Sequence, residues 1–175
     1  DRLLKGADVV VFSDYGKGVL THISDMILQA KKFGKLVLID PKGSDFEKYR
    51  GASYITPNKN ELRAVVGSWD NEDDLMSKVQ TLRDHIDLSG VLVTRSEEGM
   101  TLFEKHQVEH FQTVAREIFD VSGAGDTVIG VLAAYLASGM NISESVRLAN
   151  KAAGIVVGKL GTATTSFDEL FREGF

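Results

Sequence analysis

The sequence of 175 residues contains no cysteine and no long hydrophobic run. The absence of cysteine excludes disulfide bonds and thiolate zinc sites, and it fits a reducing compartment, which we expect to be the cytoplasm. No apolar run approaches the roughly 18 residues that span a bilayer, so we expect no membrane segment. The chain also lacks excess positive charge, because its formal net charge is −5. It therefore offers no electrostatic basis for binding nucleic acid or an anionic membrane surface.

Short apolar runs alternate with amphipathic segments over the first 94 residues. We expect Thr21 to cap the first helix and Gly34 to end it. Buried strands of this kind, separated by amphipathic helices, predict a largely parallel sheet covered by helices on both faces. The expected strands are residues 9–12, 36–39, 54–56 and 91–94, and the expected helices are residues 21–33, 58–66 and 71–86.

The pattern changes after residue 94. Residues 101–104 and 107–113 flank a polar pair and predict an antiparallel hairpin. Two helices are expected at 125–138 and 143–159, with Asn141 as a turn residue before the second. Ser166 and Glu169 have the spacing of a capping box that opens a last short helix. The sequence shows no internal repeat or long linker, and its length suits one domain.

The most informative stretch is DVSGAGDT at residues 120–127, directly before a long apolar helix. Gly123, Ala124 and Gly125 leave backbone N–H groups uncovered at the helix N-terminus, where the helix dipole attracts a phosphate. A carboxylate competes with phosphate there, so Asp126 is explained if it accepts a proton from a hydroxyl that attacks phosphorus. The alternative is a glycine-rich turn in which Asp126 is an ordinary first-turn acidic residue.

Polar, glycine-containing segments follow the predicted strands. In open parallel α/β sheets, ligands bind beyond the carboxyl ends of the strands. We therefore expect these segments to line one crevice together with the start of the glycine-rich helix. The segments are residues 14–18, 40–44, 56–61 and 94–99.

Asn58 and Glu61 have two compatible interpretations. Their spacing is that of a capping box, which is a structural role. Glu61 at a strand's carboxyl end also suits magnesium held through water, because that ion keeps several of its waters. The amide of Asn58 is placed to reach a nucleotide phosphate.

Two common nucleotide motifs are disfavoured. Val128 stands where a dinucleotide fingerprint needs its third glycine, and Leu160 cannot supply the magnesium-binding hydroxyl of a P-loop. A flavodoxin-like receiver, with Asp14 and Asp40 as its acidic cluster, would leave the glycine-rich motif unexplained. The four histidines have no metal-ligand spacing, and Ser122 has no histidine partner near it in sequence for acyl transfer.

The motif at 120–127, the NKNE sequence at 58–61 and the turn at 94–99 together resemble the ribokinase-like, PfkB-type family of carbohydrate kinases. Within the family the likeness is to heptose 7-phosphate kinase domains, through residues 13–18, 39–46, 49–52 and 158–162. The resemblance covers nearly the whole chain. It implies a ribokinase-like three-layer sandwich.

The resemblance also implies roles for individual residues. Asp126 would be the catalytic base, and the amides at Gly123, Ala124 and Gly125 would hold the charge of the transferred phosphoryl group. The remaining roles form a longer set: Asn58, Glu61, Thr94, Gly99, Asn150 and Gly154 for ATP, Glu61 for Mg²⁺, Asp120 for a monovalent cation such as K⁺, and Asp14, Lys17 and Lys42 for the sugar substrate.

The implied reaction transfers the ATP γ-phosphate to the C1 hydroxyl of D-glycero-D-manno-heptose 7-phosphate, a precursor of the lipopolysaccharide core. Kinases of this family are about twice as long as this chain. We therefore expect residues 1–175 to be the C-terminal, nucleotide-side part of a kinase domain, inactive alone. A missing N-terminal half, a following adenylyltransferase domain and a homodimer of the full-length protein are further expectations. The alternatives are another ribokinase-like kinase or a nucleotide-binding module without activity.

Overall fold

A computed structural model describes residues 2–115 and 119–171. Its six strands form one sheet in chain order. The first four strands are parallel, and the last two extend the sheet as an antiparallel hairpin. The strands are β1 (Val9–Ser13), β2 (Leu36–Asp40), β3 (Tyr54–Ile55), β4 (Gly90–Thr94), β5 (Met100–Glu104) and β6 (Val108–Phe111).

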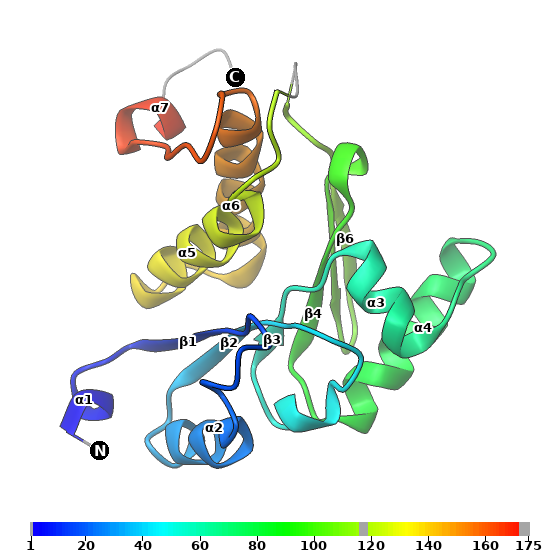
Figure 1. Ribbon diagram of the computed structural model, residues 1–175, viewed down its shortest axis with the longest axis vertical. Helices are drawn as coiled ribbons and strands as arrows, with labels where there is room; N and C mark the ends of the chain where they lie inside the picture. Colours follow the sequence, from blue (N-terminus) through cyan, green and yellow to red (C-terminus); the bar gives the residue numbers. More distant parts are fainter. Residues whose placement is uncertain (1, 116–118, 172–175) are drawn as a thin grey trace.

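Helices cover both faces of the sheet (Figure 1). Successive residues of a strand point to opposite faces, so Val37 and Ile39 of β2 enter one core while Leu38 enters the other. The first core also holds α2 (Ile23–Lys32), α3 (Lys59–Val66) and α4 (Glu72–His85), and the second holds α5 (Ala124–Ala137) and α6 (Ile142–Val157). The predicted α/β sandwich with a mostly parallel sheet is therefore confirmed.

The predicted helices and strands are all present, with differences at their ends. The prediction that Thr21 caps α2 is wrong, because the N-cap is His22 without a side-chain bond and the Thr21 hydroxyl donates to the Gly18 carbonyl, 2.7 Å away. Asn141 is the N-cap of α6 and accepts from the Glu144 amide. The short helices are α1 (Arg2–Lys5), η1 (Glu47–Tyr49), η2 (Ser96–Glu98) and α7 (Phe167–Phe171), and the capping box of Ser166 and Glu169 opens the last.

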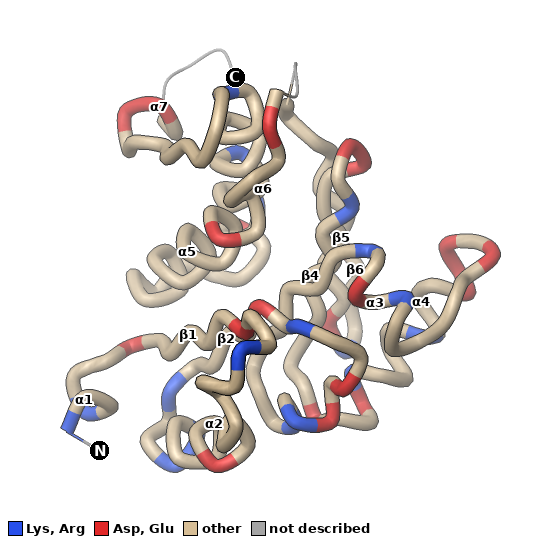
Figure 2. Tube along the Cα trace, viewed as in Figure 1, with Lys and Arg blue, Asp and Glu red and all other residues tan. Residues whose placement is uncertain are grey.

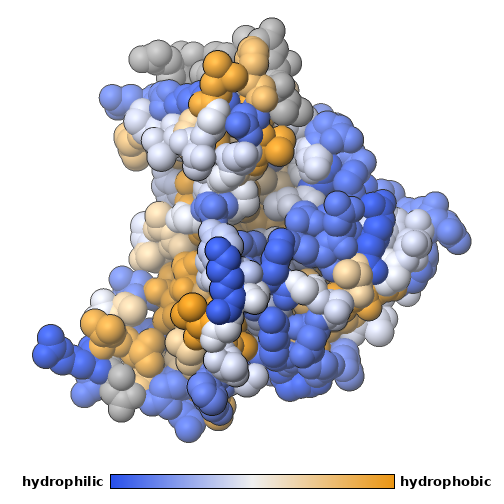
Figure 3. Space-filling model, in the orientation of Figure 1, coloured by the Kyte–Doolittle hydropathy of each residue, from blue (hydrophilic) through white to orange (hydrophobic). Residues whose placement is uncertain are grey.

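The outer surface differs between the two ends of the sheet. Figure 3 shows hydrophilic atoms over α3 and α4 and apolar atoms toward β1. β1 is the first strand of the sheet, and Val11 on it is 40% exposed. Among the described residues, no helix has the length and apolar character needed to cross a bilayer.

Candidate active site

A cavity of about 640 Å³ lies where the turns after β3 and β4 face the N-terminus of α5 and the middle of α6. It brings together most of the residues predicted to contact a nucleotide. They are Asn58, Thr94, Gly99, Ala124, Gly125, Asn150 and Gly154. Sequence positions almost 100 residues apart thus share one concave surface, as expected for a ligand site at the carboxyl ends of parallel strands.

Two glycines shape one wall of this cavity by close packing. Gly99 has a φ of +86°, and a β-carbon there would lie 2.0 Å from the Phe111 carbonyl oxygen. A β-carbon on Gly154 would lie 2.7 Å from Val114 Cγ2. Asn150 is buried and its amide donates to the Gln112 carbonyl over 2.7 Å. All three residues therefore hold the chain that follows β6 against the cavity.

The N-terminus of α5 presents free donors to the cavity. Gly123 is the N-cap in the left-handed conformation, with a φ of 79°, and its carbonyl accepts from the Thr127 amide. The Ala124 amide donates a hydrogen bond to the Val121 carbonyl and closes a turn. The amides of Gly125 and Asp126 lie in the first turn, where a helix offers no acceptor. A β-carbon on Gly125 would meet no atom within 4 Å, so this position is not packed against another segment.

Asp126 connects the cavity to the loop after β1. Its neighbour Gly125 lines the cavity, while its own carboxylate accepts a hydrogen bond from the Tyr15 hydroxyl over 3.0 Å. Lys17 is exposed, and its Nζ lies 5.9 Å from the centroid of the Tyr15 ring. The structure therefore places the predicted base beside Tyr15, which lies in the 14–18 segment predicted to line the crevice.

Negative charge accumulates at the ends of β1 and β2, where Figure 2 shows acidic and basic segments next to one another. The pKa of Asp40 is raised to about 6, first by burial and then by the charges of Glu61 and Asp126. Lys42 offsets part of this charge, because its Nζ lies 3.0 Å from Glu61 Oε1. The pKa of Lys42 is raised by this hydrogen bond and by the charge of Glu61.

Asp14 is buried, and its acceptor sites are occupied. It receives hydrogen bonds of 2.7 Å from the Gly16 amide, Lys48 Nζ and the Tyr49 hydroxyl. Burial alone would raise the pKa of Asp14, but these three donors outweigh it and lower the pKa. Asp14 therefore fixes the loop that carries Tyr15 and Lys17.

Asn58 and Glu61 form the complete capping box of α3. The Asn58 side chain accepts from the amides of Asn60 and Glu61, and Glu61 Oε2 accepts from the Asn58 amide. Asn58 also pairs with Thr94 in an isolated parallel bridge, which extends the contact of β3 and β4 to the cavity. The structural role of this motif is thus present, and Asn58 faces the cavity in addition.

Asp120 lies outside this cavity, three residues before the α5 N-cap Gly123. Its carboxylate accepts from the Ser122 amide over 2.8 Å. That bond, followed by hydrogen bonds from the Ser122 side chain and the Gly161 amide, lowers the pKa of Asp120. The residue closes the turn that leads into the glycine-rich motif.

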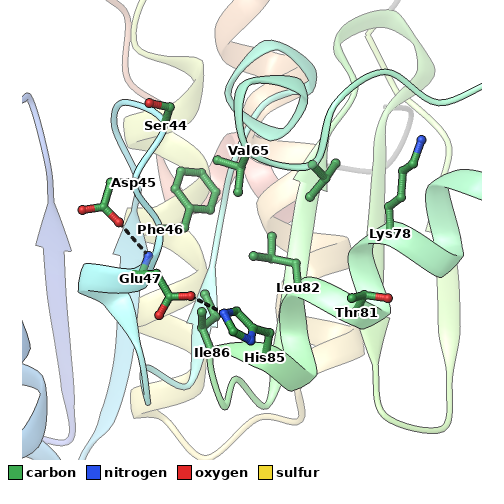
Figure 4. A pocket seen from close by; sticks show the side chains of 11 residues that line it. Ser44, Asp45, Phe46, Glu47, Val65, Lys78, Thr81, Leu82, His85 and Ile86 are labelled. Carbon is green, nitrogen blue, oxygen red and sulfur yellow. Dashed lines mark hydrogen bonds and ion pairs between the residues drawn. The ribbon is translucent and has the colours of Figure 1, made fainter.

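A second hollow of about 400 Å³ lies away from these strand ends, between η1 and the helices α3 and α4 (Figure 4). Its floor is apolar, with Phe46, Leu82 and Ile86 buried. Its charged groups are engaged with one another or with backbone, for example Glu47 with His85 (Figure 4). This hollow contains none of the residues predicted to bind ATP, metal or sugar, although Ser44, the last residue of the predicted crevice segment 40–44, lines it.

The fold and the glycine-rich helix start are those of a carbohydrate kinase family. Residues 3–169 match the pfkB family of carbohydrate kinases, and the chain belongs to that family. The predicted family resemblance is therefore confirmed.

Relatives agree with this assignment. The chain is 54% identical over 171 residues to "Bifunctional protein HldE" of Pasteurella multocida, covering 97% of this chain and 36% of that protein. It is 55% identical over 172 residues to "Bifunctional protein HldE" of Chromohalobacter salexigens, covering 98% of this chain and 36% of that protein. The chain thus spans little more than a third of these relatives.

Solved structures share the fold at lower identity. A ribokinase from Arabidopsis thaliana, complexed with ribose and ATP, superposes with a TM-score of 0.80 at 23% identity, over 92% of this chain and 53% of that chain. Phosphofructokinase-2 from Escherichia coli, in complex with potassium, has a TM-score of 0.80 at 21% identity, over 97% and 59%. These likenesses support the fold.

Sequence reasoning did not identify four side chains that the structure places at the site. Tyr15 bonds the predicted base, Tyr49 and Lys48 hold Asp14, and Lys59 lines the cavity. Tyr15 lies in the predicted crevice segment 14–18, and Lys59 lies in the NKNE sequence at 58–61. Their partners lie 111 and 39 residues away, and no local pattern reports such distant contacts.

Proposed function

We propose that the chain is the nucleotide-side part of an ATP-dependent sugar kinase in which Asp126 is the catalytic base. The observation that carries this proposal is the position of Asp126. It stands between the open amides at the start of α5 and the loop after β1. A phosphoryl donor in the cavity and a hydroxyl acceptor at that loop would meet at its carboxylate.

The chemistry follows from these groups. The sugar hydroxyl gives its proton to Asp126 as its oxygen attacks the γ-phosphorus of ATP, and ADP leaves. The amides of Gly125 and Asp126 donate to the phosphoryl oxygens, where negative charge spreads in the transition state. Tyr15, which donates to one carboxylate oxygen in the present structure, leaves the other free for the sugar.

Among the described residues, no group of three or more histidine or carboxylate side chains could hold a metal ion directly. Mg²⁺ keeps several of its waters, so it would be held through water and would neutralise phosphate charge when bound. Burial is the largest cause of the raised pKa of Asp40, and the negative charges of Glu61 and Asp126, which would attract a cation, raise it further. Because Glu61 already bonds Lys42 and the Asn58 amide, it would hold the ion through water. Asp120 is the proposed site of a monovalent cation.

The acceptor that we propose is the C1 hydroxyl of D-glycero-D-manno-heptose 7-phosphate. The support is the 53–55% identity to proteins called HldE. Lys17, in the loop that carries Tyr15, and Lys42, beside Glu61, would supply positive charge for the sugar phosphate. The hydrogen bonds of Tyr49 with Asp14 and the Lys42 amide orient their loops. Sugar contacts from a preceding part of the chain, a following adenylyltransferase domain, a homodimer and a cytoplasmic location belong to the same proposal.

The test is Asp126→Asn in the protein at its natural full length. We expect ATP affinity to change little and kcat to fall by roughly 10²–10⁴, the usual effect of removing a positioned acid–base group. Asp25→Asn is a matched control, because Asp25 is an exposed first-turn acidic residue of α2. If both variants retain near-normal turnover, Asp126 is an ordinary first-turn residue. ATP binding without turnover in the unmodified protein would indicate a nucleotide-binding module.

A further inference from the structure

The cavity that we assign to the nucleotide contains little positive charge. Among its lining residues in the described part of the chain, Lys59 is the basic one and Glu97 the acidic one. ATP with magnesium is an anion, and the open amides of α5 are its other source of attraction. The location of the Lys59 ammonium group therefore bears directly on nucleotide affinity.

Lys59 is paired with an acidic residue at the rim of the cavity. Its Nζ lies 2.7 Å from Glu98 Oε1, with side-chain exposures of 23% and 43%. The hydrogen bond from Lys59 is the largest cause of the lowered pKa of Glu98. The pair thus joins the first turn of α3 to the η2 turn.

The two partners differ in how firmly they are held. Glu98 also accepts from Arg95 Nε over 2.9 Å, and the Arg95 guanidinium is fixed by Glu72 through bonds of 2.8 and 2.6 Å. Lys59 has a flexible four-carbon stem that lets its ammonium group swing to another anion. Moving Lys59 therefore leaves the Arg95 network intact.

The position of Lys59 on its helix favours a nearby anion. It is the first residue of α3, directly after the cap Asn58. The positive end of the helix dipole disfavours a lysine there, unless a negative group compensates. Glu98 supplies that group in the present structure, and a nucleotide phosphate in the adjoining cavity would supply it as well.

We propose that Lys59 is a phosphate ligand of the nucleotide and that Glu98 competes with the nucleotide for it. This inference rests on the proposed function. An ion pair with an exposed partner contributes little to stability, whereas charge-assisted bonds to phosphate are strong, so the exchange is favourable. Glu98 then lowers ATP affinity by holding Lys59.

The experiment measures binding of ATP·Mg by calorimetry in the full-length protein, without sugar. Lys59→Met should raise Kd by about five- to tenfold, because one charge-assisted bond to phosphate is lost. The loss is partly offset, since ATP no longer has to break the Lys59–Glu98 pair. Glu98→Gln should lower Kd by about threefold, because Lys59 is freed while Gln still accepts from Arg95. The double variant should bind as weakly as Lys59→Met, and adenosine, which has no phosphate, should bind equally well to all four proteins.

Lys31→Met is the matched control, since Lys31 forms a similar pair with Asp87 over 3.3 Å outside the cavity. It should leave Kd unchanged. If both site variants weaken ATP and adenosine alike, the pair only braces the η2 turn and the inference is wrong. Parental ATP affinity in Lys59→Met overturns it too. An unmodified protein that binds no ATP·Mg overturns the proposed function and this inference together.

Discussion

Tyr49→Phe is a test of what holds the loops of the candidate active site. The Tyr49 side chain is fully buried, and its hydroxyl joins two loops that follow neighbouring strands. It donates to Asp14 Oδ2 over 2.7 Å and accepts from the Lys42 amide over 2.9 Å. The substitution removes one oxygen atom and leaves the packing of the ring, including its contact with Phe46, in place.

The expected loss of unfolding free energy follows from the groups left behind. Asp14 keeps its bonds from Lys48 and Gly16, so its carboxylate remains largely satisfied. The part-buried Lys42 amide loses the tyrosine acceptor. A net hydrogen bond contributes about 1 kcal/mol and an unsatisfied buried group costs about 1–3 kcal/mol, so we expect a loss of about 2 kcal/mol.

Urea denaturation measures this loss, with an unchanged m-value showing that the compactness of both states is preserved. Tyr135→Phe is the control, because Tyr135 lies on α5 outside this network and packs its ring against Phe171. It should lose less than about 0.5 kcal/mol, as is usual away from such features. A Tyr49→Phe variant as stable as the parent would refute the claim that the hydroxyl holds these loops together.

The remaining predictions concern the acidic cluster. Glu61→Gln keeps the capping box, so the melting temperature should change little. The magnesium concentration for half-maximal activity should rise several-fold, because the variant lacks the carboxylate proposed to hold the ion. Unchanged magnesium dependence would leave Glu61 a purely structural cap. The pKa of Asp40 is raised to about 6 from 3.8. Because the folded state then binds a proton that the unfolded state has released, unfolding free energy should fall as pH rises from about 4 to 6 and level off above it. Asp40→Asn should abolish that part of the slope, and an identical pH profile in the variant would contradict this.

Much of the fold was predictable because local chemistry determines it. Apolar runs at β2 and β4 are bounded by polar residues, and their alternation places side chains in both cores. Asn58 with Glu61, and Ser166 with Glu169, are caps whose donors and acceptors lie within three residues. Such interactions need no knowledge of the rest of the chain.

Other features depend on groups that are distant in sequence. Thr21 has the right chemistry for a cap, but its hydroxyl donates to the Gly18 carbonyl in the preceding turn. The buried Asp14 finds Lys48 and Tyr49 more than 30 residues away. The resemblance assigned Asp14 to the substrate, and the hydrogen bonds that it accepts from Lys48 and Tyr49 become visible only once η1 packs against the loop.

The two parts of the candidate site have opposite electrostatic character. At the cavity, the amides of Gly125 and Asp126 attract an anion, whereas at the strand ends Asp40 and Glu61 add negative charge beside Asp126. A nucleotide alone would bring its γ-phosphate toward carboxylates that repel it. Binding of the phosphates at the amides therefore favours a cation at the strand ends, since the cation is attracted by both the phosphate and the carboxylates. The proposed catalytic carboxylate beside the proposed phosphate site would thus be compatible with nucleotide binding when the cation arrives with the nucleotide.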